Sequence, residues 1–487
     1  MKRFIKISAV ALLVVLAMTG CKKSYTITVK SNNAEWGTVT GSGSYKDGET
    51  ATISAIPAQG YYFNCWNDGN TENPRKIVVS GNAEFIATFS DTPGGGGGTE
   101  GAVEISGAIS SNATWTNHSG GVDYIIEGTF WVEGNALLTV EPGVTIMFSG
   151  VDGAIVVEEN AGLRMVGTAD NPITLTGPTN NQNPGAWDRV EVTSNRNDNQ
   201  FEYVNFVNGG SGDQVLYVSG KLSMKHCNIN YSQSNGAVLG YEGVFTAFEN
   251  NSLQHVSGYP LVLNTHEKVN CLGTGNTYNT SPNYDQTFNM IMIDDYWLDE
   301  DNVTATFTNQ GIPYYLRDGI NVDGNAVMRV NAGVEFVFAY DKEMVVGENA
   351  LIQVDGTSAQ PVVFRGFENE NGFWDGIDVD AERSTNGGSY LNHCQILNAG
   401  NDIDDAALST DEDTRLVLNN VTISGSDGYG MKISIPVDWD TDQYSFSNYH
   451  VSATGLNFSG CASGNIYESN KDQVFSSWPV NKKLAKR

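Results

Sequence analysis

Apolar and polar residues alternate in short runs between residues 134 and 177, the most regular stretch of the chain. Alternation with a period of two is typical of a strand that buries one face. Turn-forming residues separate the runs, and no helical period occurs among them. Short strands so closely spaced predict a chain that coils and stacks each coil on the last as a parallel sheet. The apolar pairs expected to line the interior are Leu138 and Val140, Ile146 and Phe148, Ile155 and Val157, Leu163 and Met165, and Ile173 and Leu175.

The same pattern returns later in the chain. GNAVMRVNAGVEFVF, which starts at Gly324, repeats GNALLTVEPGVTIMF, which starts at Gly134. Interior positions stay apolar, and the match extends outward on both sides at a nearly constant offset. Residues 101–487 are therefore expected to contain two tandem copies of one unit, 101–300 and 301–487.

A smaller unit precedes the copies in residues 21–89. It contains strand-like runs such as Tyr25–Val29 and a motif Gly-Tyr-x-Phe-x-x-Trp that begins at Gly60. With its final Ala-x-Phe, this motif resembles the divergent internalin B-repeat family, a compact β-domain of bacterial surface proteins. The resemblance implies an adhesion module or a spacer that lifts the next domain from the membrane, and we favour the spacer. The side chains expected to form its core are Phe63, Trp66, Phe85 and Phe89.

Residues 90–100, with the sequence SDTPGGGGGTE, are dominated by glycine. Such a composition is typical of a flexible linker. We therefore expect the boundary between the two domains here.

The two copies also contain motifs of a known superfamily. Leu138-x-Val140-x-Pro-Gly, followed by Ile146-x-Phe148, resembles the right-handed parallel β-helix of the pectate-lyase-like superfamily. The resemblance implies an all-β, right-handed parallel β-helix for residues 101–487, and this hand also follows the general rule for parallel crossovers. The superfamily includes lyases, hydrolases, tailspikes and plain adhesins, so the fold leaves the function open.

Few signatures of the superfamily's enzymes are present. Of the polygalacturonase-like set Asn-Thr-Asp, Asp-Asp, Gly-His-Gly and Arg-Ile-Lys, the chain has only Asp-Asp pairs, and the pectate-lyase-like motifs Trp-x-Asp-His and Arg-x-Pro-x-x-Arg are absent. Paired carboxylates would still serve acid–base chemistry on a glycosidic bond. The candidates, if the protein is an enzyme, are Asp294, Asp295, Asp404 and Asp405. The alternative, which we favour, is that these pairs are solvated acidic turns.

Alternating carboxylates at Asp438, Asp440 and Asp442 resemble a calcium loop, because calcium prefers oxygen ligands. The sequence departs from the EF-hand pattern, with Gln443 in place of the required Gly and Tyr449 in place of the closing Glu. The loop is therefore interpreted either as a calcium site or as an exposed acidic turn, and we favour the turn.

Residues 1–20 predict a lipoprotein signal peptide. Lys2 and Arg3 provide its positive end, an apolar run follows, and Met18-Thr-Gly-Cys21 resembles a bacterial lipobox with Met in place of the usual Leu. The alternatives are an ordinary secretory signal or a membrane span, for which the apolar run is short. Cys21 is accordingly the expected site of lipid attachment.

No aspartate follows Cys21. Under the sorting rule known for bacterial lipoproteins, its absence directs the protein to an outer membrane. An acidic run that some bacteria use to place lipoproteins on the outer face is also missing, so both the cell surface and the periplasmic face remain open.

Charge and cysteine content exclude several classes of protein. The formal net charge of −29 argues against a nucleic-acid partner, which requires a positive face. Six cysteines without a CxxC motif, one of them assigned to lipid, argue against a disulfide framework or a zinc site. The composition is that of an extracytoplasmic β-protein.

These observations predict a membrane-anchored scaffold that binds a glycan or an envelope component without cleaving it. The alternatives are a divergent polysaccharide lyase or glycoside hydrolase and a purely structural envelope protein. No cofactor is required, and calcium is the one metal that the acidic loops would take.

The first testable prediction concerns the anchor. If Cys21 carries lipid, Cys21→Ser should move the protein from the membrane fraction to the soluble fraction of fractionated cells. A Cys227→Ser variant is the control and should stay with the membranes. Membrane retention of the Cys21→Ser variant would contradict the lipobox interpretation.

Overall fold

The computed structural model describes residues 23–58, 61–67, 72–90, 102–118, 121–279, 288–401 and 405–479. The signal peptide, Cys21 and nearly all of the linker lie outside these residues. Contacts divide the chain into two units, residues 1–98 and 99–487, and each is described by itself.

The first unit is a small β-domain with two sheets. In the first sheet, β1 (Ser24–Ser31) lies between β3 (Gly43–Lys46) and β7 (Ala83–Ser90), and β5 (Tyr62–Trp66) follows β7. In the second sheet, β4 (Thr50–Pro57) lies between β2 (Gly37–Thr40) and β6 (Arg75–Val78).

The expected aromatic core of this domain is present. Trp66 and Phe89 are buried, and the ring of Phe63 lies 5.3 Å from that of Trp66 and 6.0 Å from that of Phe89 between centroids. Phe85 is partly buried against the same cluster. A domain of this size has room for one such core.

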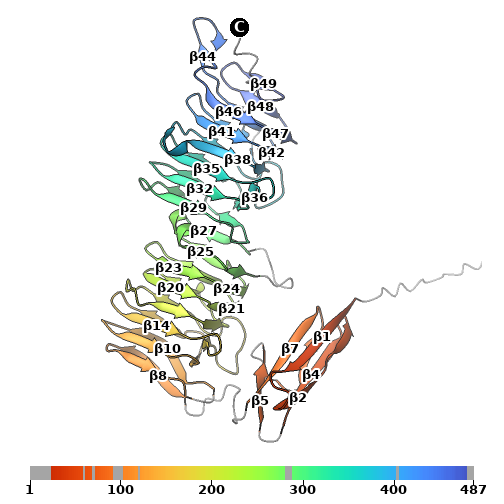
Figure 1. Ribbon diagram of the computed structural model, residues 1–487, viewed down its shortest axis with the longest axis vertical. Coiled ribbons are helices and arrows are strands. Elements are labelled where there is room, and N and C mark those ends of the chain that lie inside the picture. The colour runs from red at the N-terminus through yellow and green to blue at the C-terminus, as the bar shows by residue number, and fades with distance from the viewer. Residues whose placement is uncertain are drawn as a thin grey trace, which may run out of the picture. The chain divides into compact units, whose positions relative to one another are not determined.

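The second unit is the expected parallel β-helix, in which successive coils lie one above the next (Figure 1). Each coil of copy 1 contributes one strand to each of three sheets. The first sheet contains β12 (Thr145–Phe148), β15 (Ile173–Thr176), β18 (Val204–Val207), β21 (Asn228–Ser232), β24 (Ser252–Val256) and β26 (Thr277–Tyr278). The second contains β13 (Ala154–Val157), β16 (Val190–Val192), β19 (Gln214–Val218), β22 (Asn235–Leu239), β25 (Leu261–Leu263) and β27 (Ile291–Ile293). The third contains β9 (Ala113–Trp115), β11 (Leu137–Val140), β14 (Gly162–Val166), β17 (Gln200–Glu202), β20 (Lys221–Lys225) and β23 (Val244–Glu249).

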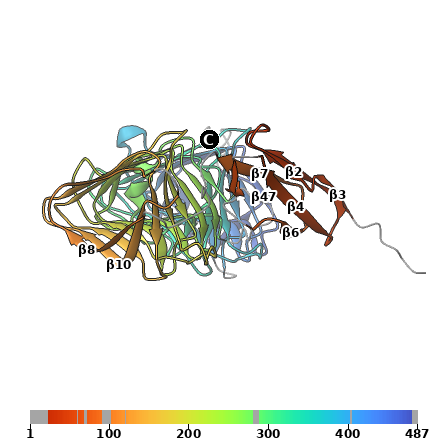
Figure 2. The same cartoon turned by 90° about the horizontal axis from the view of Figure 1, so that it is seen from below.

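Two long strands begin this stack. β8 (Val103–Ile109) and β10 (Tyr124–Val132) each run through the first and the second sheet, with a register shift between Ile126 and Phe130. Seen from below, β8 and β10 lie at one end of the overlapping coils (Figure 2).

Copy 2 repeats the arrangement. Its first sheet contains β30 (Tyr314–Leu316), β33 (Glu335–Phe338), β36 (Val362–Gly366), β39 (Cys394–Leu397), β42 (Thr422–Ser424) and β47 (Asn457–Ser459). Its second contains β28 (Trp297–Leu298), β31 (Ile320–Val322), β34 (Glu343–Val346), β37 (Gly376–Val379), β40 (Ala406–Thr410), β43 (Tyr429–Ile433) and β48 (Gly464–Glu468). Its third contains β29 (Thr304–Phe307), β32 (Val327–Asn331), β35 (Leu351–Asp355), β38 (Ser389–Asn392), β41 (Arg415–Asn419) and β46 (His450–Thr454).

The interior follows the alternation in the sequence. All ten side chains of the expected pairs from Leu138 to Leu175 are at most 2% exposed. One cluster of buried apolar residues extends from Trp115 in copy 1 to Ile466 in copy 2. The two copies therefore share a single continuous core.

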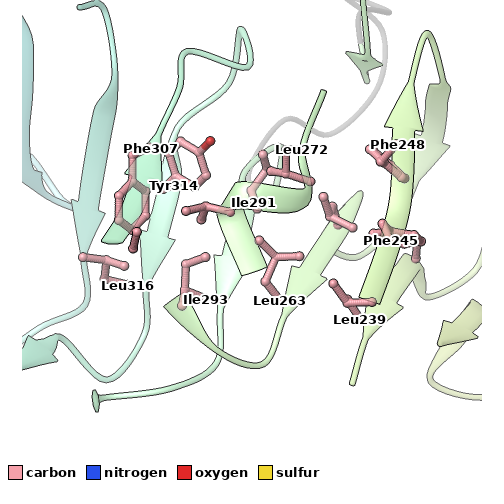
Figure 3. Packing of buried hydrophobic residues seen from close by; sticks show 14 of the residues in the cluster. Leu239, Phe245, Phe248, Leu263, Leu272, Ile291, Ile293, Phe307, Tyr314 and Leu316 are labelled. Atoms are coloured by element: carbon pink, nitrogen blue, oxygen red, sulfur yellow. The ribbon is translucent and has the colours of Figure 1, made fainter. Parts of the chain in front are cut away.

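At the junction between the copies, the strands of one sheet continue into a different sheet of the next copy. β25 pairs with β27, and β27 pairs with β30, so the second sheet of copy 1 becomes the first sheet of copy 2. The short 3-10 helix η1 (His266–Cys271) packs against β23 and β29 and joins the two third sheets. Leu263, Ile291 and Tyr314 keep the interior filled across this step (Figure 3).

One tryptophan in the core of each copy stacks on a phenylalanine, and the two tryptophans occupy equivalent positions. Trp187 stacks on Phe148 with ring centroids 4.4 Å apart, and Trp374 stacks on Phe338 at 4.0 Å. Each indole Nε1 donates to a backbone carbonyl at 2.8 Å, that of Val207 or Leu397. Both tryptophans are 0% exposed, so they are interior residues of the β-helix.

Sharp corners link the third sheet to the first. In copy 1 three of these corners have one non-glycine residue with positive φ, at Tyr203 (50°), His226 (53°) and Asn250 (56°). A single residue in the left-handed region reverses the chain direction within a short turn. The Tyr203 and His226 rings also stack at 4.8 Å, so the corners of adjacent coils support one another.

The C-terminal end departs from the parallel pattern. β49 (Gln473–Phe475) pairs antiparallel with β48, and β44 (Val437–Asp438) forms a hairpin with β45 (Gln443–Tyr444). A second 3-10 turn, η2 (Thr385–Gly387), precedes β38. An antiparallel partner covers the edge of β48 that a further coil would otherwise occupy.

The second prediction concerns the stacked tryptophans. Trp187→Ala should lower the free energy of unfolding by about 3–5 kcal/mol, because it removes a large buried side chain and leaves a cavity. Urea unfolding of the full chain measures the change. Trp439→Ala, at a position that is 70% exposed, is the control and should change stability by no more than about 0.5 kcal/mol. Equal effects of the two substitutions would contradict this account of the core.

Candidate functional site

A hollow lies on the outer face of the second sheet of copy 1. Its volume is ≈ 620 Å³, and it extends over β10, β13 and β16. We call it the Trp131 hollow. It is lined by Thr129, Trp131, Gly134, Ala154, Val156, Glu158, Glu159, Asn160, Arg189, Glu191 and Thr193.

Strand alternation explains why Trp131 faces outward. Its neighbours Phe130 and Val132 are 1% and 0% exposed in the core, so the residue between them projects from the other face. Trp131 is 39% exposed. In register, Trp131 pairs with Ala108 on one side and Val156 on the other. Small neighbours on both sides leave the indole accessible from the hollow.

Charged side chains form the opposite wall. Arg189 donates from Nε to Glu191 at 2.9 Å and from Nη1 to Asp188 at 2.5 Å. Partial burial lowers the pKa of Arg189, but the hydrogen bonds and charges of Glu191 and Asp188 outweigh burial and raise the pKa above its ordinary value. The Trp131 hollow thus combines an aromatic ring, a floor of small side chains and a fixed ion pair.

A second hollow lies on the same sheet of copy 2, one coil further along than the position equivalent to the Trp131 hollow. Its volume is ≈ 240 Å³, and it lies over β34, β37 and β40 of that copy's second sheet. Val345 and Asp378 stand in the register that Val156 and Glu191 occupy in copy 1. We call it the Asp375 hollow. It is lined by Glu343, Asp375, Gly376, Ile377, Asp378, Asp405, Ala406, Ser409 and Lys432.

The Asp375 hollow is strongly acidic. Burial, together with the charges of Asp341, Glu343 and Asp405, raises the pKa of Asp375 to about 6. Its Oδ1 atom is buried and has no hydrogen-bond partner among the residues that the structure describes. Ser409 donates to Asp378 at 2.6 Å. A carboxyl in such a field retains its proton at a pH where an exposed aspartate is ionised.

Asp380, two residues beyond Asp378, extends the acidic surface. Burial first, and then the charges of Asp378 and Asp411, raise the pKa of Asp380 to about 7. A hydrogen bond with Asp411 and the charge of Glu348 act in the same direction. Two carboxyls on this sheet therefore bind protons close to neutral pH.

An exposed tryptophan also lies on the outer face of the second sheet of copy 2, on its first strand, β28. Trp297, 48% exposed, pairs in register with Asn321, which pairs with Val345 and so leads to the Asp375 hollow. The ring of Tyr296 lies 5.1 Å from that of Trp297, and its hydroxyl donates to Glu343 at 3.4 Å. Both copies thus place an exposed indole beside carboxylates on the second sheet.

The carboxylates expected from sequence do not form one site. Asp294 is paired with Arg317 at the junction, and the backbone N–H of Trp297 donates to the Asp295 side chain at 3.2 Å. Asp405 lines the Asp375 hollow, four strand spacings further along the same sheet. At ~4.8 Å per spacing this is a separation of roughly 19 Å, too far to act on one glycosidic bond. Asp404 lies outside the described residues.

The carboxylates of the expected calcium loop are engaged elsewhere. Asp438 Oδ1 accepts from the backbone N–H groups of Asp440 and Thr441 at 3.1 and 3.3 Å, which is an ordinary turn. Asp442 pairs with Lys471 at 3.0 Å. Within the described ranges, no group of three or more His, Cys, Asp and Glu side chains is placed to hold a metal ion. The structure therefore does not assemble Asp438, Asp440 and Asp442 into a calcium site.

The proposed anchor lies beyond the described part of the chain, since Cys21 and the signal peptide precede residue 23. Among the described residues, no helix has the length and apolar character needed to cross a membrane.

Sequence reasoning missed the residues of the Trp131 hollow and, apart from Asp405, those of the Asp375 hollow. Trp131 follows a strand residue that packs inward, so alternation alone would have predicted that its side chain lies on the surface. Aligning the two copies would also have matched Glu191 with Asp378 as outward charged positions. No motif marks either residue, because each hollow forms from strands of successive coils that are distant in sequence.

The fold and these surfaces define a parallel β-helix protein with a small β-domain before it. Residues 27–93 match the family model of the divergent InlB B-repeat domain, and residues 107–227 match that of the pectate-lyase-like beta helix domain. Both resemblances expected from the sequence are thereby confirmed. No curated protein and no solved structure matches the chain. The two domain matches indicate an extracellular, carbohydrate-related protein.

The third prediction follows from the raised pKa of Asp380. Because the folded-state pKa, about 7, lies above the ordinary value of 3.8, the stabilising contribution of protonated Asp380 is complete below pH ~3.8 and is lost as pH rises through ~7. Asp380→Asn should therefore raise the urea midpoint most at pH 8, and the gain should shrink toward pH 4.

Asp440→Asn, in an exposed turn, serves as the control for this experiment. It should shift the midpoint little at any pH. A gain for Asp380→Asn that is the same at pH 8 and pH 4 would show that Asp380 does not titrate in this range.

Proposed function

We propose that the protein is a lipid-anchored, extracytoplasmic scaffold that binds a glycan on the outer face of its β-helix and does not cleave it. The observation that carries this proposal is the Trp131 hollow, where an exposed indole faces a floor of small side chains and a charged wall. The matches to a pectate-lyase-like β-helix and a B-repeat domain support a carbohydrate ligand.

The chemistry of a sugar fits this arrangement. A pyranose ring has an apolar face of C–H groups that packs on an aromatic ring, while its hydroxyls donate to carboxylates and accept from guanidinium N–H groups. Trp131 provides the ring, and Glu158 and Glu191 provide acceptors at the edge. The hollow extends over three coils, so it offers room for a chain of sugars.

The ion pair of Arg189 supports binding over cleavage in this hollow. A glycosidase needs one carboxyl that retains its proton and donates it to the leaving oxygen. Glu191 instead accepts hydrogen bonds from the Arg189 guanidinium, with contacts at 2.8 and 2.9 Å. Glu191 therefore suits the role of hydrogen-bond acceptor and not that of general acid.

One observation favours a second candidate function. In copy 2, Asp375 and Asp380 have pKa values raised to about 6 and about 7, as a general acid requires, and further carboxylates adjoin them. A divergent glycoside hydrolase would use this surface. The predicted general acid would then be Asp375 or Asp380, which stand at opposite ends of β37, roughly 16 Å apart, and so would each act with a different neighbouring carboxylate in place of the pairs expected from sequence.

The proposed placement combines both domains. Lipid on Cys21 would hold the protein at an outer membrane, on its cell-surface or periplasmic face. The B-repeat domain and the glycine-rich linker would act as a spacer between the membrane and the β-helix. A purely structural envelope protein remains the alternative if no glycan binds.

The fourth prediction tests glycan binding. Full-length protein should be retained on one or more immobilised plant, host or bacterial polysaccharides, and Trp131→Ala should weaken retention by about 30-fold, which corresponds to loss of a contact worth ~2 kcal/mol. Trp439→Ala, an exposed tryptophan outside the hollow, is the matched control and should bind as the wild type does.

Two outcomes would contradict the proposal. New reducing or unsaturated ends that disappear in Asp375→Asn or Asp380→Asn would identify an enzyme. Retention on none of the polysaccharides would contradict glycan binding and favour a purely structural envelope protein.

A further inference from the structure

The charges around the Trp131 hollow are unbalanced. Three carboxylates line it, from Glu158, Glu159 and Glu191, against the single guanidinium of Arg189. Glu158 and Glu159 lie in the turn after β13 and are exposed at the rim. Any ligand that enters the hollow therefore meets a negative edge.

Arg189 does not offset this edge for an anionic ligand. Its Nε and Nη2 atoms contact Glu191 at 2.9 and 2.8 Å, and its Nη1 contacts Asp188 at 2.5 Å. A carboxylate on the ligand would have to displace one of these partners and leave it unpaired in a half-buried position. The fixed pairs keep the guanidinium engaged on both sides.

The Asp375 hollow of copy 2 has the same sign of charge. Glu343, Asp375, Asp378 and Asp405 line it, with Lys432 as the one cation. The raised pKa of Asp375, caused by burial and by neighbouring carboxylates, reflects a negative local potential. The chain as a whole carries a formal net charge of −29. The Trp131 hollow, on which glycan binding is proposed, and the Asp375 hollow therefore both repel anions.

Calcium would reverse this repulsion only by bridging carboxylates of the protein to those of a ligand. In the part of the chain that the structure describes, no group of three or more potential ligands is placed to hold a metal. The geometry gives no support to such a bridge.

We infer that the glycan recognised in the Trp131 hollow is an uncharged polysaccharide, and that chains of uronic acids or sulfated sugars are rejected. This inference rests on the proposed function and specifies its ligand class. The indole selects for the C–H face of a sugar, and the carboxylates select against negative substituents on it. Hydroxyl groups of a neutral sugar donate to these carboxylates without a charge penalty.

The test compares chains of the same sugar backbone with and without added carboxylates. Full-length protein is measured against glucan, xylan and mannan and against the carboxymethylated derivative of each. For a neutral chain that binds, the carboxymethylated form should bind at least ~10-fold more weakly at low salt. This difference in affinity should become smaller as the salt concentration is raised.

Two sets of variants locate the effect. The double variant Glu158→Gln, Glu159→Gln should reduce the difference in affinity between the neutral and the charged chain, because it removes carboxylates at the rim. The double variant Glu104→Gln, Glu127→Gln changes the net charge equally at exposed positions that do not line the hollow, and it should leave this difference unchanged. Trp131→Ala should weaken the binding of both chains by the same factor.

The outcomes separate this inference from the proposed function. Equal or tighter binding of the charged chain, still lost in Trp131→Ala, would overturn the inference while glycan binding stands. Binding of neither chain would overturn both.

Discussion

The inward stacking of apolar side chains, coil upon coil, is the interaction on which the rest of this β-helix depends. Each coil is too short to bury its own apolar face, and it does so only against its neighbours. Parallel pairing in register brings like positions together, so that Ile146 lies over Leu175, and Leu175 over Phe206. The stacked pairs of Trp187 with Phe148 and of Trp374 with Phe338 are buried aromatic contacts of this interior that recur in both copies.

This constraint acts on one face of each strand and leaves the other free to change. Inside, the copies still match, as the two buried tryptophans show. Outside, Trp131 in copy 1 has become Asn321 in copy 2, and Ala154 has become Glu343 at the same place in the ladder. The hollow of copy 1 is consequently lined by an indole and an ion pair, while the hollow of copy 2, one coil further along, is lined mainly by carboxylates. Duplication conserved the scaffold and let its surfaces diverge.

The sequence predicted the parts of this architecture that periodicity encodes. The ten interior residues between Leu138 and Leu175 were read directly from alternation, and the copies were read from their repeated spacing. The change of sheet at the junction was not predicted, because strands β26 to β28 are short and carry little alternation. The candidate site was missed for a related reason. Asp294, Asp295, Asp404 and Asp405 were chosen as adjacent pairs, whereas the hollows bring together residues one coil apart, such as Trp131, Val156 and Glu191.

The most direct measurement is a crystal structure of the chain with an oligosaccharide cut from a polysaccharide that it retains. The account predicts a sugar ring stacked on Trp131, with hydroxyl groups within hydrogen-bond distance of Glu158 or Glu191. An oligosaccharide bound to the first or third sheet, or to the small β-domain, would contradict the assignment of the Trp131 hollow as the binding site.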